Sequence, residues 1–201
     1  RHALERSRGL GEEYKGQAEE TDTSQKHGPL QGVRETRCGV VSALELLTKI
    51  RSSAYEARGN STQTVEAYHR LITHLLDLSQ DMAEATSNPE MIQRTRSLAA
   101  FSTAKEYASM QRAVLAAALP ANNAQIGDLS SNDRLYAQSA LESQKSEIRS
   151  FKGIDGPAKA TELLKPIEDN NATITASDKY ASRALASQGG LADLPKRSYQ
   201  D

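Results

Sequence analysis

The stretch LAAFSTAKEYASMQRAVLAAAL, residues 98–119, gives the clearest indication of the fold. A row of residues at alternating three- and four-residue steps runs through it: Leu98, Phe101, Lys105, Ala108, Arg112, Leu115 and Leu119. This heptad spacing is the pattern with which one long helix packs against another. The sequence therefore predicts a long helix from about residue 89 to residue 119, with this row, called the heptad row below, facing a neighbour.

The rest of the chain divides into further helices on either side of this one. Capping residues indicate helix starts at Gly28-Pro29, Asn60-Ser61, Ser87-Asn88-Pro89-Glu90 and Ser130 to Asp133, and Pro29 and Pro89 add proline in the first turn of two of them. Besides 89–119, we expect helices over 1–20, 30–50, 61–82 and 130–151, and a helical region over 157–188. Pro166 and the β-branched run Thr173 to Thr175 predict a kink or a break in that last region.

These features place the protein in the all-α class, with long antiparallel helices packed in bundles. Hydrophobic residues make up 37% of the chain and aromatic residues 4%, with no tryptophan. Such a composition fits helices cored by aliphatic residues and alanine better than a β-sandwich, which needs more β-branched and aromatic side chains.

Charge and motif content exclude several classes of function. The net charge is −1, without the basic stripe that nucleic-acid binding requires. Cys38 is the single cysteine, His69 and His74 are five residues apart, and Glu66-x-x-His69 occurs once, so we expect no disulfide and no metal site. No phosphate-binding loop, dinucleotide fingerprint or nucleophile elbow is present, and we expect neither an enzyme nor a cofactor.

Two cations lie in the heptad row where apolar side chains are expected. An arginine buried there costs several kcal/mol unless it is paired. Arg112 would therefore pair with an acid on a neighbouring helix, reach the surface, or hold a ligand anion. Lys105 reaches water more easily through its long stem. Arg37, between Val33 and Val40, has the same ambiguity.

Two short stretches of the chain resemble each other and a known family. Glu5 to Leu10 and Ser109 to Val114 both place an arginine before a small residue and then an aliphatic one. Leu4 to Gly11 and Lys105 to Leu115 resemble the two motifs of the nitrate- and nitrite-sensing domain of bacterial signalling proteins. Ser7 and Gln111 stand where that family often has glutamate, and Ser109 stands where it has glycine.

The resemblance implies two helical bundles side by side that hold one nitrate or nitrite between two arginines. By motif these are Arg8 and Arg112, with Ser109, Lys105 and Arg37 as further candidates. It implies a single sensor module with one bundle half over 1–86, a second over 87–190, and an exit segment over 191–201.

The resemblance further implies the extracytoplasmic domain of a membrane-bound, homodimeric sensor histidine kinase, or alternatively a cytoplasmic regulator. No apolar stretch approaches the ~18 residues that span a bilayer, and the chain has no initiating methionine. We therefore expect a piece of a longer protein whose membrane segments lie elsewhere. The alternative function is a helical interaction or dimerisation module without a small ligand.

Overall fold

The computed structural model describes residues 30–56, 61–120, 127–168, 172–186 and 190–196. Within these ranges every regular element is a helix, which confirms the all-α prediction. The elements are α2 (Gln31–Glu56), α3 (Ser61–Ala85), α4 (Pro89–Ala118), α5 (Ser131–Asp155), α6 (Pro157–Glu168), α7 (Ala172–Ala186) and the short 3-10 helix η2 (Gly190–Asp193). The helix expected over residues 1–20 lies outside the described residues.

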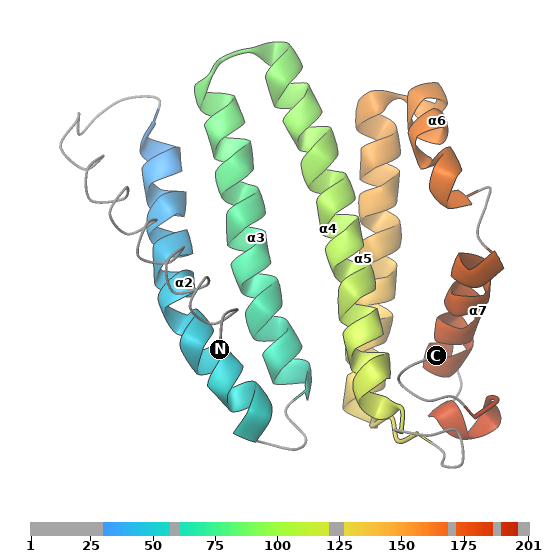
Figure 1. The fold of residues 1–201 in the computed structure, drawn as a ribbon. Coiled ribbons are helices and arrows are strands. Elements are labelled where there is room, and N and C mark those ends of the chain that lie inside the picture. Colours follow the sequence, from blue (N-terminus) through green and yellow to red (C-terminus); the bar gives the residue numbers. More distant parts are fainter. Residues whose placement is uncertain (1–29, 57–60, 121–126, 169–171, 187–189, 197–201) are drawn as a thin grey trace, which may run out of the picture.

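The four long helices α2 to α5 lie side by side in chain order, each antiparallel to the next (Figure 1). Their main contacts join consecutive helices, and α6 and α7 pack against α5, with α7 also touching α4. Since α3 runs back between α2 and α4, the latter two helices begin at the same end of the molecule (Figure 1).

The helix ends follow the capping signals in the sequence. The Asn88 side chain accepts hydrogen bonds from the backbone N–H groups of Glu90 and Met91, at 3.0 and 3.2 Å, and Pro89 opens α4. The Ser130 hydroxyl caps α5 by accepting from the backbone N–H of Asp133. The predicted break is confirmed, because α6 ends two residues after Pro166 and α7 starts at Ala172.

The core formed by α4 to η2 combines alanine with larger aliphatic side chains and Phe151. One cluster joins α4 and α5 to α7 and η2, and a second joins α4 and α5 to α6. Their buried members are Val114, Leu115, Ala137, Ala184, Leu185, Leu191 and Leu194 in the first cluster, and Ala100, Phe151, Ala160 and Leu164 in the second. Alanine at these positions lets the helix axes approach closely.

The prediction that the heptad row of α4 faces the core is wrong at three of its seven positions, whereas Phe101, Leu115 and Leu119 do pack in or against the two clusters. Leu98 is 64% exposed, and Lys105 and Arg112 are also exposed, whereas Leu115 is buried. The buried residues of α4 are instead Ser97, Ala100, Ala104, Met110, Gln111, Val114 and Leu115. Their centre lies about 100° around the helix from the heptad row. The regular spacing of the heptad row therefore does not mark the side on which α4 packs.

Candidate functional site

The exposed side of α4 brings together three of the candidate residues. Lys105, Ser109 and Arg112 are spaced by four and three residues, which places them within about 60° of one another around the helix. Lys105 and Arg112 are exposed and Ser109 is half-buried. Arg112 lies about 35 Å along α4 from its start at Pro89, at 1.5 Å per residue.

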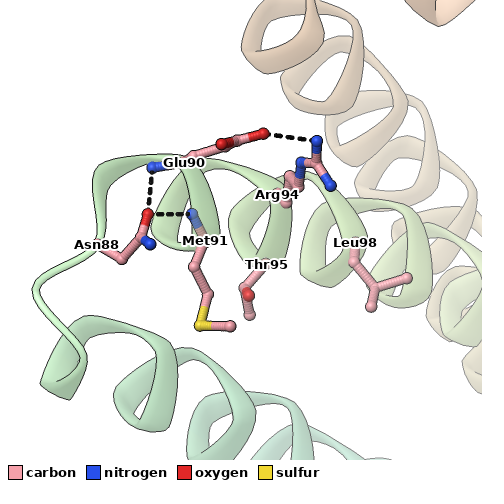
Figure 2. A pocket seen from close by; sticks show the side chains of 6 residues that line it. All are labelled: Asn88, Glu90, Met91, Arg94, Thr95 and Leu98. Atoms are coloured by element: carbon pink, nitrogen blue, oxygen red, sulfur yellow. Dashed lines mark hydrogen bonds and ion pairs between the residues drawn. The ribbon is translucent and has the colours of Figure 1, made fainter.

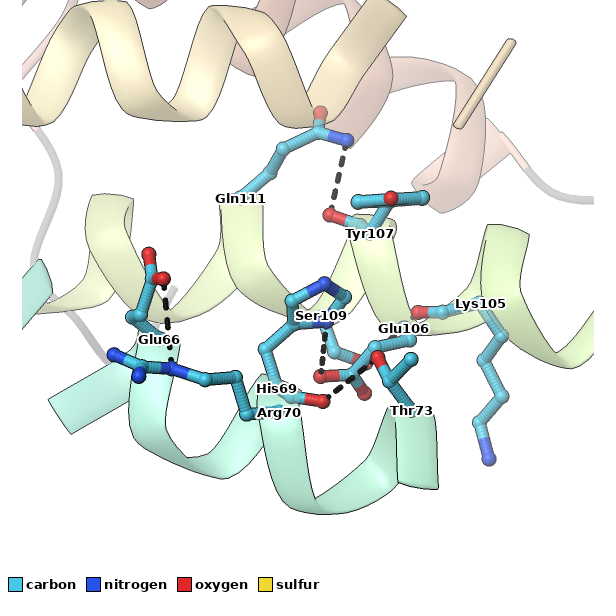
Figure 3. A network of polar contacts seen from close by, with 9 residues as sticks. All are labelled: Glu66, His69, Arg70, Thr73, Lys105, Glu106, Tyr107, Ser109 and Gln111. Carbon is cyan, nitrogen blue, oxygen red and sulfur yellow. Dashed lines mark hydrogen bonds and ion pairs between the residues drawn. The ribbon is translucent and has the colours of Figure 1, made fainter. Parts of the chain in front are cut away.

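Neither cation on this side of α4, Lys105 or Arg112, has an acidic partner in the part of the chain that the structure describes. No ion pair or hydrogen bond joins the side chain of either Lys105 or Arg112 to a described residue. The neighbouring carboxylate, Glu106, points towards α3 and away from Lys105 (Figure 3). The Ser109 hydroxyl donates to the Lys105 carbonyl oxygen at 3.0 Å and keeps its lone pairs free.

The other two arginines of α4 differ from Arg112 in having acidic partners. Arg94 Nη2 lies 2.5 Å from Glu90 Oε1, and Arg96 Nη2 lies 3.1 Å from Glu84 Oε1. The negative charge of the partner in each pair discourages an anion. Arg112 therefore offers the better anion-binding guanidinium on this helix.

The structure does not bring Arg37 beside Arg112. Arg37 is half-buried on α2, about 9 Å from the end at which α2 and α4 both begin, whereas Arg112 is about 35 Å from it. Helix α3 also lies between the two helices (Figure 1). Arg8 is outside the described residues.

An open hollow of about 360 Å³ lies nearer the start of α4 (Figure 2). Asn88, Glu90, Met91, Arg94, Thr95 and Leu98 line it. Arg94, the cation that lines the hollow, pairs with Glu90, and the side-chain oxygen of Asn88 accepts a hydrogen bond as the helix cap. The hollow thus has little to offer a free anion, although it shares the exposed side of α4 with Arg112.

A half-buried cluster of polar side chains lies where α3, α4 and α5 meet. His69 Nδ1 is 3.6 Å from Glu106 Oε1, and the His69 and Tyr107 rings are 5.3 Å apart (Figure 3). The Tyr136 hydroxyl of α5 is buried with no hydrogen-bond partner of ordinary geometry among the described residues. Burial raises the pKa of Tyr136 to about 12, and the carboxylates of Glu66 and Glu106 add to the rise.

Only part of this cluster of polar side chains can be predicted from the sequence. Glu66-x-x-His69 was evaluated as a metal-binding pair, and no group of histidine, cysteine and acidic side chains that could hold a metal occurs within the described ranges. His69 instead faces α4, whereas His74 packs against Gly39 of α2, so the two histidines lie on different sides of α3. The partner of His69, Glu106, is 37 residues away, and helical periodicity carries no signal for such a pair.

The comparison with protein families assigns the chain as a whole. Residues 3–201 match the family described as nitrate and nitrite sensing. The chain belongs to that family. The matched range includes both Arg112 on α4 and Arg8. No curated protein and no solved structure matches the chain. Membership confirms the resemblance found in the two arginine motifs and makes a small oxyanion the ligand class for this family member.

The described helices of this family member contain no segment long and apolar enough to cross a bilayer.

Proposed function

We propose that this member of the nitrate- and nitrite-sensing family binds its anion between Arg112 and Arg8. The observation that carries the proposal is the exposed Arg112 guanidinium, which has no acidic partner among the described residues while both other arginines of α4 have one. Lys105 and Ser109 on the same side add a second positive charge and a hydroxyl. These two residues would assist binding without being essential for it.

The chemistry of guanidinium suits nitrate. Both groups are planar, and guanidinium can donate two parallel hydrogen bonds to two oxygens of the anion. Two arginines that face each other at about 4 Å repel by roughly 4 kcal/mol at an effective dielectric of about 20. An anion between them removes this repulsion. Binding therefore favours the arrangement in which the two segments are close.

Chain geometry allows Arg8 to reach Arg112. If residues 8–20 are helical, as the sequence predicts, they extend about 18 Å. Residues 21–28 can add up to about 26 Å when extended. Arg8 can then lie up to about 44 Å from the start of α2, and Arg112 lies about 35 Å from the same end of the molecule.

We further propose that the anion acts by shifting the equilibrium between two helix arrangements. A ligand changes such an equilibrium only through its different affinity for the two states, and the relief of arginine repulsion supplies that difference. The shift would pass along a helix to an output domain, in a homodimeric sensor histidine kinase whose sensor lies outside the cytoplasm.

Calorimetric titration with nitrate tests the site. Arg112→Ala and Arg8→Ala should each abolish the heat of binding, because one guanidinium alone in water holds nitrate weakly, while helical circular dichroism stays unchanged. Arg94→Ala is the matched control, an exposed arginine on the same helix that is paired with Glu90, and it should bind as the wild type does. Nitrate binding that survives both substitutions would place the site elsewhere.

A helical interaction module remains the second candidate. Ten large apolar side chains are exposed in the described ranges, four of them on α3 and α4 (Leu75, Met82, Met91 and Leu98). Such side chains are typical of surfaces that bind another helix. Under this alternative, anions would have no selective effect, and a partner or second copy would cover α3 and α4.

A further inference from the structure

The contact between His69 and Glu106 joins α3 to α4 where both side chains are largely covered, whereas the other ion pair of these two helices, Glu84 with Arg96, is about half exposed. His69 is on α3 and its side chain is 20% exposed; Glu106 is on α4 and its side chain is 13% exposed. The distance of 3.6 Å is within the range of an ion pair but too long for a strong hydrogen bond. Accordingly, His69 Nδ1 is buried with no hydrogen-bond partner among the described residues.

The environment of Glu106 makes the charge on His69 important. A carboxylate this well buried is costly unless a cation accompanies it. No lysine or arginine of the described ranges pairs with Glu106. Neutral His69 leaves Glu106 as an uncompensated negative charge, whereas protonated His69 turns the contact into an ion pair.

The groups around the contact provide little positive charge that could compensate Glu106. On α3, Glu66 and Arg70 form a pair with 3.6 Å between Oε1 and Nε, so Arg70 is already engaged. From α5, Tyr136 faces the carboxylates of Glu66 and Glu106 with a buried hydroxyl. From α4, the Tyr107 ring lies against the His69 ring, tilted by 42°. Apart from Arg70, none of these neighbours can supply positive charge to Glu106.

We propose that His69 is a proton-dependent positioning residue: its protonated imidazole holds Glu106, and so fixes the packing of α4 against α3. Glu106 follows Lys105 directly and lies on α4 less than two turns before Arg112. The rotation of α4 that turns Glu106 towards α3 is the same rotation that presents Lys105 and Arg112 outwards. Loss of the proton from His69 would weaken its pairing with Glu106, and α4 would be held less firmly in this rotational position against α3.

Thermal unfolding of the nitrate-free protein at several pH values tests the pairing. The pair should raise the melting temperature more at pH 5.5 than at pH 8, because only a protonated imidazole attracts the Glu106 carboxylate. A window from pH 5.5 to 8 avoids the titration of surface carboxylates such as Glu84 and Glu142. Hydrogen bonds from Gln80 and Arg96 lower the pKa of Glu84 below the usual 4.5, and Lys145 does the same for Glu142.

Three variants separate this contact from the other histidines. In His69→Gln and Glu106→Gln, the fall of the melting temperature between pH 5.5 and pH 8 should be about 2–4 °C smaller than in the wild type, as expected for a pair worth about 1 kcal/mol. His74→Gln is the matched control, since His74 lies on the same helix but packs against α2. It should keep the wild-type dependence.

The proposal is overturned if His69→Gln keeps the wild-type dependence on pH, or if His74→Gln loses it to the same extent. If His69→Gln does not fold, Glu106→Gln alone decides, because it preserves the shape of the side chain and removes its charge. A wild-type dependence in that variant also overturns the proposal.

The consequence for sensing rests on the proposed function and has its own readout. Wild-type affinity for nitrate should be higher at pH 5.5 than at pH 8, and in His69→Gln this difference should be smaller while binding at pH 8 is unchanged. If no nitrate binds at either pH, the proposed site fails, whereas the unfolding result still decides the His69–Glu106 pairing. If nitrate binds with the same pH dependence in both proteins, His69 does not position the anion site.

Discussion

The sequence offers two arguments for Arg112, the heptad row and the family motif, and the structure contradicts the first of them. The heptad row implied a buried guanidinium in need of a counter-charge, but Arg112 is exposed. What distinguishes it is its lack of an acidic partner in the described part of the chain, whereas Arg94 and Arg96 have one. Pairing depends on where neighbouring helices place their acids, and no pattern along a single helix contains that information.

Tyr136 is expected to make stability fall in alkaline solution. Burial, with the charges of Glu66 and Glu106, raises its pKa from 10.0 to about 12. A raised pKa in the folded state means that the stabilisation is complete below pH 10 and is lost as the pH rises towards 12. Ultraviolet titration should show one tyrosine whose pKa is about 12, above the usual range for tyrosine.

The matched variant for this prediction is Tyr136→Phe, which removes the unpartnered hydroxyl and preserves the ring. It should unfold less steeply with pH above 10 and should be about as stable as the wild type at pH 7. Denaturant unfolding at pH 7, 10 and 11 measures both. An unchanged slope above pH 10 would mean that Tyr136 does not carry this dependence.

At the scale of helices, the sequence predicted starts well and packing sides poorly. Caps such as Asn88 and Ser130 act through their own neighbours in the chain, so α4 and α5 begin where the sequence indicates. The packing side of α4 depends on Ala100 and Ala104, whose small side chains let α5 approach closely. Alanine gives hardly any hydrophobic contrast, and the larger residues of the heptad row therefore dominated the pattern.

Gly127 lies against the end of α4 and gives a prediction on stability. A Cβ on Gly127 would lie 2.6 Å from the backbone oxygen of Ala118 and 2.5 Å from Leu191 Cδ1, so the backbone would have to shift. Gly127→Ala should cost about 1–3 kcal/mol, the range for overpacking. Denaturant unfolding measures it as a lower midpoint.

Gly153 supplies the control for that substitution. It lies exposed in the last turns of α5, and nothing is within 4 Å of a Cβ built there. Gly153→Ala should stabilise the protein by about 0.5–1 kcal/mol through the higher helix propensity of alanine. Equal midpoints for the two variants would contradict the close approach at Gly127.

At the scale of the whole molecule, the fold class and the family were accessible from sequence, and the arrangement of the site was not. The all-α class follows from periodicity and caps, and the two arginine motifs identified the family that matches residues 3–201. The division into halves at residues 86 and 87, and the partnership of Arg8 with Arg112, stay predictions. Both depend on how residues 1–29 pack, which is a long-range property that local patterns do not determine.

The measurement that tests the central claim most directly is a thermal-shift comparison of anions on the wild-type protein. Nitrate and nitrite should raise the melting temperature more than chloride at the same ionic strength, because chloride is a single spherical acceptor and has no pair of oxygens for the two parallel hydrogen bonds of a guanidinium. Saturation at 100 times Kd corresponds to about 2.7 kcal/mol, a shift of several degrees for a protein of this size. Equal shifts with nitrate and chloride, or none with either, would contradict anion sensing by this protein.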